Sequence, residues 1–243
     1  MFHTSIATAL QSEQFAVEHH SFRSVEDQSF IATNSLTENL LEQQVLEEAL
    51  EDFKPPIPDE CASLHFLYLT PFRYFPYRGN SRFRREGFTE GVLYSAESEV
   101  VAVAEAVKME LRFFQDSPET NFPTRVKQRS TFPVSIASPA ALDLTKGVLG
   151  MHREKWISRS YDACQTLAEQ AREAGVSALF FRSSLHDFAA RLGESNKNVA
   201  TLDCSIIKNQ QPTLRNWAIT YHASSISVAE IYGDRRFELP LSA

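Results

Sequence analysis

The chain has 243 residues, of which 43% are hydrophobic and 23% are charged, and its formal net charge at pH 7 is −7. This composition predicts a soluble folded protein with one well-buried domain and an extension, or with two small domains. The acidic balance disfavours broad nucleic-acid binding, because affinity for a polyphosphate backbone grows with the number of phosphates that basic residues neutralise.

Cysteine usage and hydropathy limit the environment of the protein. Cys61, Cys164 and Cys204 show no CxxC spacing, so we expect neither a disulfide framework nor a zinc site, and no bound metal. No run approaches the roughly 18 apolar residues that a membrane span needs, and the start of the chain lacks the basic and apolar regions of an export signal. The sequence therefore predicts a cytoplasmic protein without membrane contact.

The N-terminal quarter divides into two predicted segments. Residues 1–34 are polar with isolated apolar positions, which predicts a loosely attached leader or an irregular lid. Ser35 and Glu38 have the spacing of a capping box, and apolar residues then recur near the helical period until a pair of prolines. We predict an amphipathic acidic helix over residues 36–53. Packing on the main domain is favoured over partner binding, because an apolar stripe usually indicates burial.

An arginine-rich segment follows a strand predicted over residues 64–69. Guanidinium groups fit phosphate oxygens, and the interleaved aromatic rings offer faces for stacking. Gly79, Gly87 and Gly91 permit tight turns and close backbone approach to a ligand. The segment therefore predicts a site for a phosphorylated ligand with an aromatic base. Its arginines and aromatic residues are Arg73, Arg78, Arg82, Arg84, Arg85, Phe72, Tyr74, Phe75, Tyr77 and Phe83.

The rest of the chain predicts a mixture of strands and helices. Either Ser95 or Ser98 can cap a helix whose apolar stripe runs beside Glu105. Because the elements do not alternate regularly as βαβ units, an α+β fold is favoured over a doubly wound sheet. The predicted strands are 92–96, 131–138, 176–181, 198–203, 213–222 and 226–232, and a further helix is predicted over 157–174.

Common catalytic motifs are absent from the sequence. It contains no GxGxxG before a helix, no GxxxxGK[ST], no HExxH and no GxSxG. Dehydrogenase, P-loop and zincin chemistry therefore lack support.

Four short motifs occur in the order and spacing of a known family. They are TPFRY at 70–74, GNSRF at 79–83, GVLYSA at 91–96 followed by Glu105, and LFFRSS at 179–184 followed by NVATLD at 198–203. From about residue 60 to 232 the chain resembles the RES-domain family, toxins of bacterial toxin–antitoxin pairs named for an arginine, a glutamate and a serine. The resemblance implies a single ADP-ribosyltransferase-like domain over residues 60–243, with mixed, mainly antiparallel sheets and flanking helices, after an N-terminal extension over residues 1–59.

The resemblance also implies an activity and partners. It points to an NAD-consuming enzyme that cleaves the bond between nicotinamide and ribose, by phosphorolysis or hydrolysis, and arrests growth when free. NAD is then a substrate, and no permanently bound cofactor is expected. Transfer of ADP-ribose to a protein is one alternative, and a non-catalytic module that holds NAD or ADP-ribose is another. The expected partner is a cognate antitoxin, commonly with an Xre-type helix-turn-helix domain, while direct nucleic-acid contact is not expected and a homodimer is left open.

Carried onto matching positions, the resemblance assigns roles to six residues. A carboxylate beside the ribose stabilises the positive charge that builds up as the glycosidic bond breaks, and arginines hold the pyrophosphate of a bent dinucleotide. Tyrosines confine the nicotinamide. The catalytic residues are Glu105 and Arg73, and the substrate-binding residues are Tyr74, Arg82, Tyr94 and Ser183.

Two of these assignments have alternatives in the sequence itself. Ser184 stands next to Ser183, and Leu185 occupies a position where the family often has an arginine, so that His186 or Arg182 would have to supply a replacement cation. By its strand pattern, Tyr94 fits a core aromatic with a hydrated tip as well as it fits a ligand wall.

Overall fold

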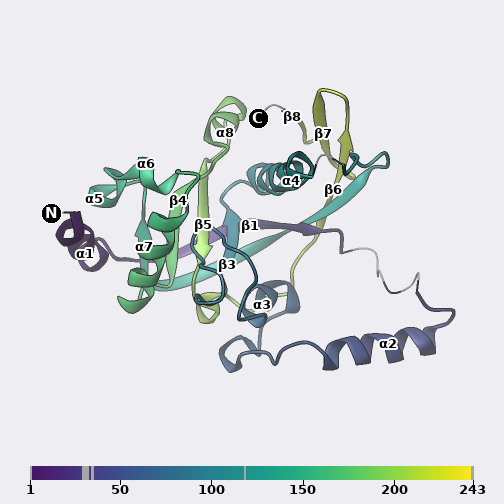
Figure 1. Ribbon diagram of the computed structural model, residues 1–243, viewed down its shortest axis with the longest axis horizontal. Helices are drawn as coiled ribbons and strands as arrows, with labels where there is room; N and C mark the ends of the chain where they lie inside the picture. The colour runs from purple at the N-terminus through teal and green to yellow at the C-terminus, as the bar shows by residue number, and fades with distance from the viewer. Residues whose placement is uncertain (1, 29–32, 34–35, 118, 242–243) are drawn as a thin grey trace.

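One mixed sheet organises the protein, of which the computed structural model describes residues 2–28, 33, 36–117 and 119–241. Within these residues the strands are β1 (Phe15–Glu26), β2 (Leu93–Ala96), β3 (Lys127–Asp143), β4 (Ala178–Arg182), β5 (Lys197–Thr201), β6 (Arg215–Tyr221), β7 (Ser225–Glu230) and β8 (Arg236–Pro240). Their hydrogen-bonded order is β1-β2-β5-β4-β3-β6-β7-β8, and β1 also pairs with β3. Strands β1, β2, β5, β4 and β3 therefore close into a small barrel, and β6 to β8 extend it from β3 (Figure 1).

The long strand β3 connects the barrel to its extension. Its beginning pairs antiparallel with β6, its end pairs in parallel with β4, and β1 lies antiparallel along most of its length. The remaining pairings, β1–β2, β2–β5, β4–β5, β6–β7 and β7–β8, are antiparallel. The predicted α+β fold with mainly antiparallel strands is therefore confirmed.

Helices cover two different parts of the sheet. The described helices are α1 (Phe2–Ser12), α2 (Leu40–Asp52), α3 (Phe66–Arg73), α4 (Glu99–Asp116), α5 (Gly147–Gly150), α6 (Arg153–Trp156), α7 (Asp162–Glu173) and α8 (His186–Leu192), with 3₁₀ turns η2 (Asp59–Cys61) and η3 (Cys204–Ile206). Helices α1, α5, α6 and α7 share a core with β4 and β5. Helices α4 and α8 share another core with β6, β7 and β8. None of the described helices is long and apolar enough to cross a membrane.

Most elements predicted after residue 90 are confirmed. The six strands predicted there correspond to β2 through β7, and the helix predicted over 157–174 is the shorter α7. Ser98, and not Ser95, caps α4, because its hydroxyl accepts a hydrogen bond from the Val101 N–H at 3.2 Å. Helix α8 and strand β8 were not predicted.

The prediction that residues 1–34 form a loosely attached leader or an irregular lid is wrong for α1 and β1. Strand β1 pairs with β3 along its whole length and with β2 at Phe22. Ser21 is its only fully buried residue, so the strand carries almost no apolar pattern that the sequence could reveal. Residues 29–32 and 34, and the predicted capping residue Ser35, lie outside the described residues.

The strand predicted over residues 64–69 is wrong, because this apolar run forms helix α3. The imidazole of His65 accepts a hydrogen bond from the Leu67 N–H at 3.3 Å and caps the helix. Leu67, Tyr68 and Phe72 are buried on its inner face against β3. A short apolar run fits a buried helix as well as a buried strand, and here tertiary packing decides.

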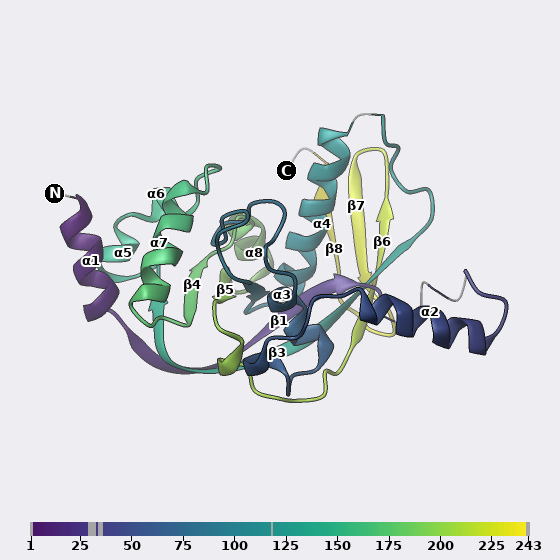
Figure 2. The same ribbon diagram turned by 60° about the horizontal axis from the view of Figure 1, so that its bottom comes forward.

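Helix α2 confirms the predicted helix, but the prediction that it packs on the main domain is wrong. Asn39 caps it, and none of its residues is buried. The side chains of Leu40, Leu41 and Phe53 are 83%, 71% and 89% exposed. Both views show α2 projecting away from the barrel (Figure 1, Figure 2).

The expectation of no disulfide is also wrong. Cys61 in η2 and Cys204 in η3 are bonded, with their Cα atoms 5.8 Å apart, and Cys164 is free and buried. The two bonded cysteines are 143 residues apart in the chain, so their spacing carried no signal.

Candidate functional site

A hydrogen-bonded cluster holds the carboxylate of Glu105 between α4 and the residues that follow β4. Its Oε1 accepts from the Ser183 hydroxyl, from the Ser184 N–H at 3.1 Å and from the Asn198 side-chain amide at 3.3 Å. Its Oε2 accepts from the Ser184 hydroxyl at 3.1 Å. These donors are all neutral, so they orient the carboxylate without cancelling its charge. Burial lowers the pKa of Lys108, on the next turn of α4, although the charge of Glu105 opposes this shift.

Ser183 fixes the geometry of this cluster. It is fully buried, and its hydroxyl donates to Glu105 and accepts from the Leu185 N–H at 2.9 Å. The structure thus brings the predicted site residues Glu105 and Ser183 into contact, and the alternative Ser184 contacts the same carboxylate. Leu185 lies buried in the core of α4 and α8, while the His186 ring lies 3.2 Å from the Ser183 carbonyl.

Glu105 faces a pocket with a volume of about 640 Å³, which is within the usual range for a small-molecule site. We call it the Glu105 pocket. Its walls come from β1, β2, the beginning of β3, α4 and β5. The lining residues are Phe22, Arg23, Ser24, Glu26, Tyr94, Ser95, Ala96, Ala102, Glu105, Ala106, Met109, Glu110, Phe113, Phe114, Lys127, Arg129 and Asn198.

Tyr94 is a core aromatic residue at the border of the Glu105 pocket, and its tip bonds to protein groups. It lines the Glu105 pocket, and its ring packs with Phe83 and Phe181 in an aromatic cluster. Its hydroxyl lies 2.9 Å from the Ser81 hydroxyl and accepts from the Phe83 N–H at 2.9 Å. Burial raises the pKa of Tyr94, so the phenol is neutral near pH 7. Tyr94 therefore connects the pocket to the loop that carries Arg82.

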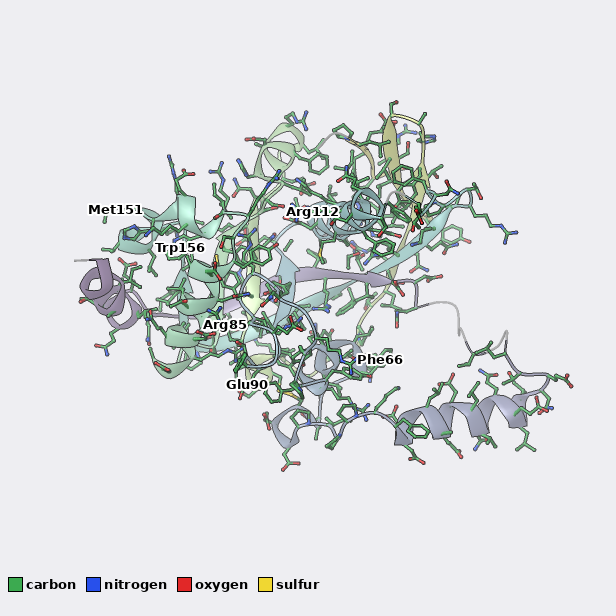
Figure 3. All side chains as sticks on the ribbon, viewed as in Figure 1. Phe66, Arg85, Glu90, Arg112, Met151 and Trp156 are labelled. Atoms are coloured by element: carbon green, nitrogen blue, oxygen red, sulfur yellow. A yellow bond between two sulfur atoms is a disulfide. The ribbon has the colours of Figure 1, made fainter. Side chains whose placement is uncertain are left out.

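Arg82 contacts α6 and α7 and is not among the pocket-lining residues. Its guanidinium donates to the Trp156 carbonyl and lies 5.1 Å from the centre of the Tyr161 ring. Figure 3 shows Trp156 on α6, on the far side of the barrel from α2.

Arg73 and Tyr74 are likewise not brought to the Glu105 pocket. The Arg73 Nε donates to the Pro55 carbonyl at 2.5 Å, and its Nη1 lies 2.6 Å from the Glu51 carboxylate. Arg73 thus holds the end of α2 and the residues after it. Tyr74 is partly exposed beside it.

The three glycines of the arginine-rich segment serve the fold. Gly79 and Gly87 have φ angles of 93° and 72°, which favour glycine at turns. At Gly91 an added Cβ would lie 2.1 Å from the Pro71 carbonyl oxygen, so the close backbone approach is to α3.

A match to a family model agrees with the motif order. The RES domain model matches residues 57–222, which is more than half of the chain. The chain belongs to the RES-domain family.

This RES-domain protein was also compared with solved structures and with curated proteins. Among solved structures, the chain is similar to the crystal structure of the M. tuberculosis MbcT–MbcA toxin–antitoxin complex, with a TM-score of 0.49 and 10% sequence identity over 89% of this chain and 92% of that chain. We draw no functional conclusion from a likeness at this level. A comparison with curated proteins gave no match.

Sequence reasoning missed several polar residues of this RES-domain site. Asn198 stands at the start of the NVATLD motif, so a signal for it was present. Arg23 belongs to β1, which precedes the matched residues and was predicted to be irregular. Arg129 lies just before the strand predicted over residues 131–138, because β3 begins at Lys127. Among the described residues, no group of three or more His, Cys, Asp or Glu side chains is arranged to hold a metal ion.

Proposed function

We propose that this RES-domain protein is the NAD-consuming toxin of a toxin–antitoxin pair and cleaves the bond between nicotinamide and ribose. The observation that carries the proposal is the Glu105 carboxylate, which is oriented by neutral donors and faces a pocket large enough for a nucleotide. An ionised carboxylate in such a place stabilises a developing positive charge, as the oxocarbenium-like transition state requires.

The proposed cleavage releases nicotinamide and transfers the ADP-ribose group to an acceptor. The electrons of the C1′–N bond move to the pyridinium nitrogen, which leaves as neutral nicotinamide, and the ribose C1′ acquires cationic character. An acceptor oxygen then bonds to C1′. With inorganic phosphate the product is ADP-ribose carrying a phosphate on C1′, and with water it is ADP-ribose and a released proton. A protein side chain as acceptor gives ADP-ribosylation instead.

The chain supplies positioning groups for this reaction. Glu105 acts on the ribose, and Ser183, Ser184 and Asn198 hold its carboxylate. Tyr94 forms a wall for the nicotinamide. Arg82 holds the dinucleotide only if its contact with the Trp156 carbonyl opens. We assign Arg73 no direct role in this arrangement, because Glu51 and Pro55 engage its guanidinium.

The setting of the activity is part of the same proposal. The toxin acts on the NAD pool of the cytoplasm, through an ADP-ribosyltransferase-like fold, and a cognate antitoxin prevents access to the Glu105 pocket. The partner's structure, including an Xre-type domain, follows from the family resemblance alone.

Regulated expression in a bacterial host tests the biological half of the proposal. Wild-type protein is expected to lower the cellular NAD content and then stop growth, while Glu105→Gln protein at equal abundance leaves both unchanged. Growth arrest without a fall in NAD content would point to modification of a protein acceptor. Equal effects of the two proteins on NAD and growth would contradict the proposal.

A further inference from the structure

Arg23 is a cation of the Glu105 pocket that forms no ion pair with a carboxylate of the described residues. It lies on β1 and lines the pocket, and its Nη1 donates to the Tyr94 carbonyl at 3.4 Å. Its Nε is buried and has no hydrogen-bond partner among the residues that the structure describes. In the described part of the chain, no Asp or Glu forms an ion pair with it. A half-buried guanidinium with a buried, unpaired Nε and no counter-charge costs folding stability, so its presence calls for another reason.

A second arginine lines the same pocket, and Glu110 and Glu26 partly offset its charge. Arg129 lies on β3, lines the same pocket and donates from Nε to the Ser24 hydroxyl at 3.1 Å. Burial and, as a smaller cause, the charge of Arg129 together lower the pKa of Arg23 to about 10. The Arg23 guanidinium is therefore still charged at neutral pH, beside another cation.

The other charges of the pocket do not compensate Arg23. The pocket lining contains three cations and three carboxylates, so its formal net charge is zero. Some of these cations form ion pairs within the pocket, and Arg23 does not. Lys127 binds Glu110, which also lies 3.9 Å from Arg129. The oxygens of Glu105 are held by neutral donors. The six groups are Arg23, Lys127, Arg129, Glu26, Glu105 and Glu110.

We propose that Arg23 and Arg129 bind the phosphate oxygens of an anionic ligand in the Glu105 pocket, with Arg23 as the principal contact. Phosphate oxygens fit the donor fork of a guanidinium and supply the negative charge that Arg23 lacks as an ion-pair partner. The inference deepens the proposed function and rests on it for the identity of the ligand. The phosphate belongs either to the diphosphate of the dinucleotide or to a free phosphate that accepts the ribose. The binding residue comes from β1, outside the residues that the family model matches.

Calorimetric titration of the full chain with ADP, inorganic phosphate and adenosine tests this inference. The key variant is Arg23→Met, which removes the charge and keeps much of the side-chain volume. The control is Arg112→Met on α4, where the arginine is exposed and outside the pocket lining (Figure 3). Wild type and the control are expected to bind ADP alike, and Arg23→Met at least tenfold more weakly. Adenosine should bind the three proteins equally.

The phosphate titration separates the two sources. If Arg23→Met loses ADP binding and none of the three proteins binds inorganic phosphate, Arg23 binds the diphosphate of the dinucleotide. Phosphate binding by wild type that Arg23→Met loses assigns it to the acceptor. Equal binding of ADP and phosphate by wild type and Arg23→Met, or binding of neither by wild type, overturns the inference.

Thermal unfolding without ligand is a second test, in which the expected effect of Arg23→Met is the opposite of a loss. If Arg23 serves a ligand, Arg23→Met leaves the melting temperature unchanged or raises it, because an uncompensated charge has been removed. A lower melting temperature with unchanged ADP binding would show a purely structural role and overturn the inference. If Arg23→Met does not fold, Arg129→Gln is measured in the same titrations, with the same loss expected.

Failure of this inference differs from failure of the proposed function. ADP and phosphate binding require no turnover, so they can depend on Arg23 in a protein that cleaves no NAD. Conversely, cleavage of NAD with unchanged kinetics in Arg23→Met leaves the function standing and removes the role of Arg23.

Discussion

The Ser183 hydroxyl makes two hydrogen bonds at a fully buried position, one to Glu105 and one from Leu185. We predict that Ser183→Ala lowers kcat for NAD cleavage by about 10- to 100-fold, as expected for loss of a hydrogen bond to a charged group. KM should change little, because the hydroxyl orients the carboxylate and does not reach the ligand. Steady-state kinetics of the purified variant measures both.

A matched control for Ser183 is Ser160→Ala, which removes an exposed hydroxyl near the start of α7. It should leave kcat and KM unchanged. A raised KM with unchanged kcat in Ser183→Ala would instead assign the hydroxyl to direct substrate binding.

Among individual site residues, the sequence located those around the Glu105 carboxylate better than the arginines of the pocket. The LFFRSS motif located Ser183 and Ser184, and the spacing after GVLYSA located Glu105. The motifs could not reveal that Arg73 is engaged by Glu51, because this contact depends on where α2 ends. Arg23 lies outside every motif, and only the closing of β1 onto β2 and β3 brings it to the pocket.

Helix α4 carries Glu105, and a buried carboxylate anchors its first turn. Glu99 accepts from the Thr131 hydroxyl, and its Oε2 lies 2.8 Å from both Arg215 and Arg235. We predict that Glu99→Ala lowers the free energy of unfolding by about 2–4 kcal/mol, somewhat less than for a fully buried pair because both arginines are partly in water. Chemical denaturation measures the change.

The partners of Glu99 provide the comparison. Arg215→Ala should cost about 1 kcal/mol or less, because the side chain of Arg215 is 53% exposed. Equal costs for the two variants would show that the carboxylate is not the centre of this network.

Elements were predictable where local pattern and tertiary packing agree. The strands from β2 to β7 and helices α4 and α7 carry clear apolar patterns or caps. Helix α3 was mistaken for a strand because its apolar run is short. The apolar residues of α2 are exposed, although their spacing is typical of a buried helix face. The spacing alone does not identify the surface against which such a face would pack.

In the described part of the molecule, a disulfide between Cys61 and Cys204 links two segments that are distant in the chain. We predict that a thiol reductant lowers the melting temperature by roughly 5–15 °C. A disulfide that closes a long loop typically adds about 2–4 kcal/mol to the free energy of unfolding. Calorimetry with and without reductant measures this shift. Cys204→Ser should melt at the lower temperature in both conditions, and a response of this variant to reductant would contradict the explanation.

The closed barrel is the feature of the whole molecule that the sequence could not predict. The irregular order of predicted strands and helices in the sequence indicated the α+β class. Closure depends on β1, a mostly polar strand that pairs with β3 across more than a hundred residues of chain. Residue patterns report local burial, and long-range pairing of a half-exposed strand leaves little trace in them.

Nicotinamide release by the purified protein tests the central claim most directly. Wild type, Glu105→Gln and the control Asp116→Asn, which changes an exposed carboxylate at the end of the same helix, are incubated with NAD with and without inorganic phosphate. We predict nicotinamide release by wild type and Asp116→Asn, and a loss of at least a hundredfold in Glu105→Gln. Release that Glu105→Gln sustains at the wild-type rate, or no release by the wild type in either condition, would contradict the account.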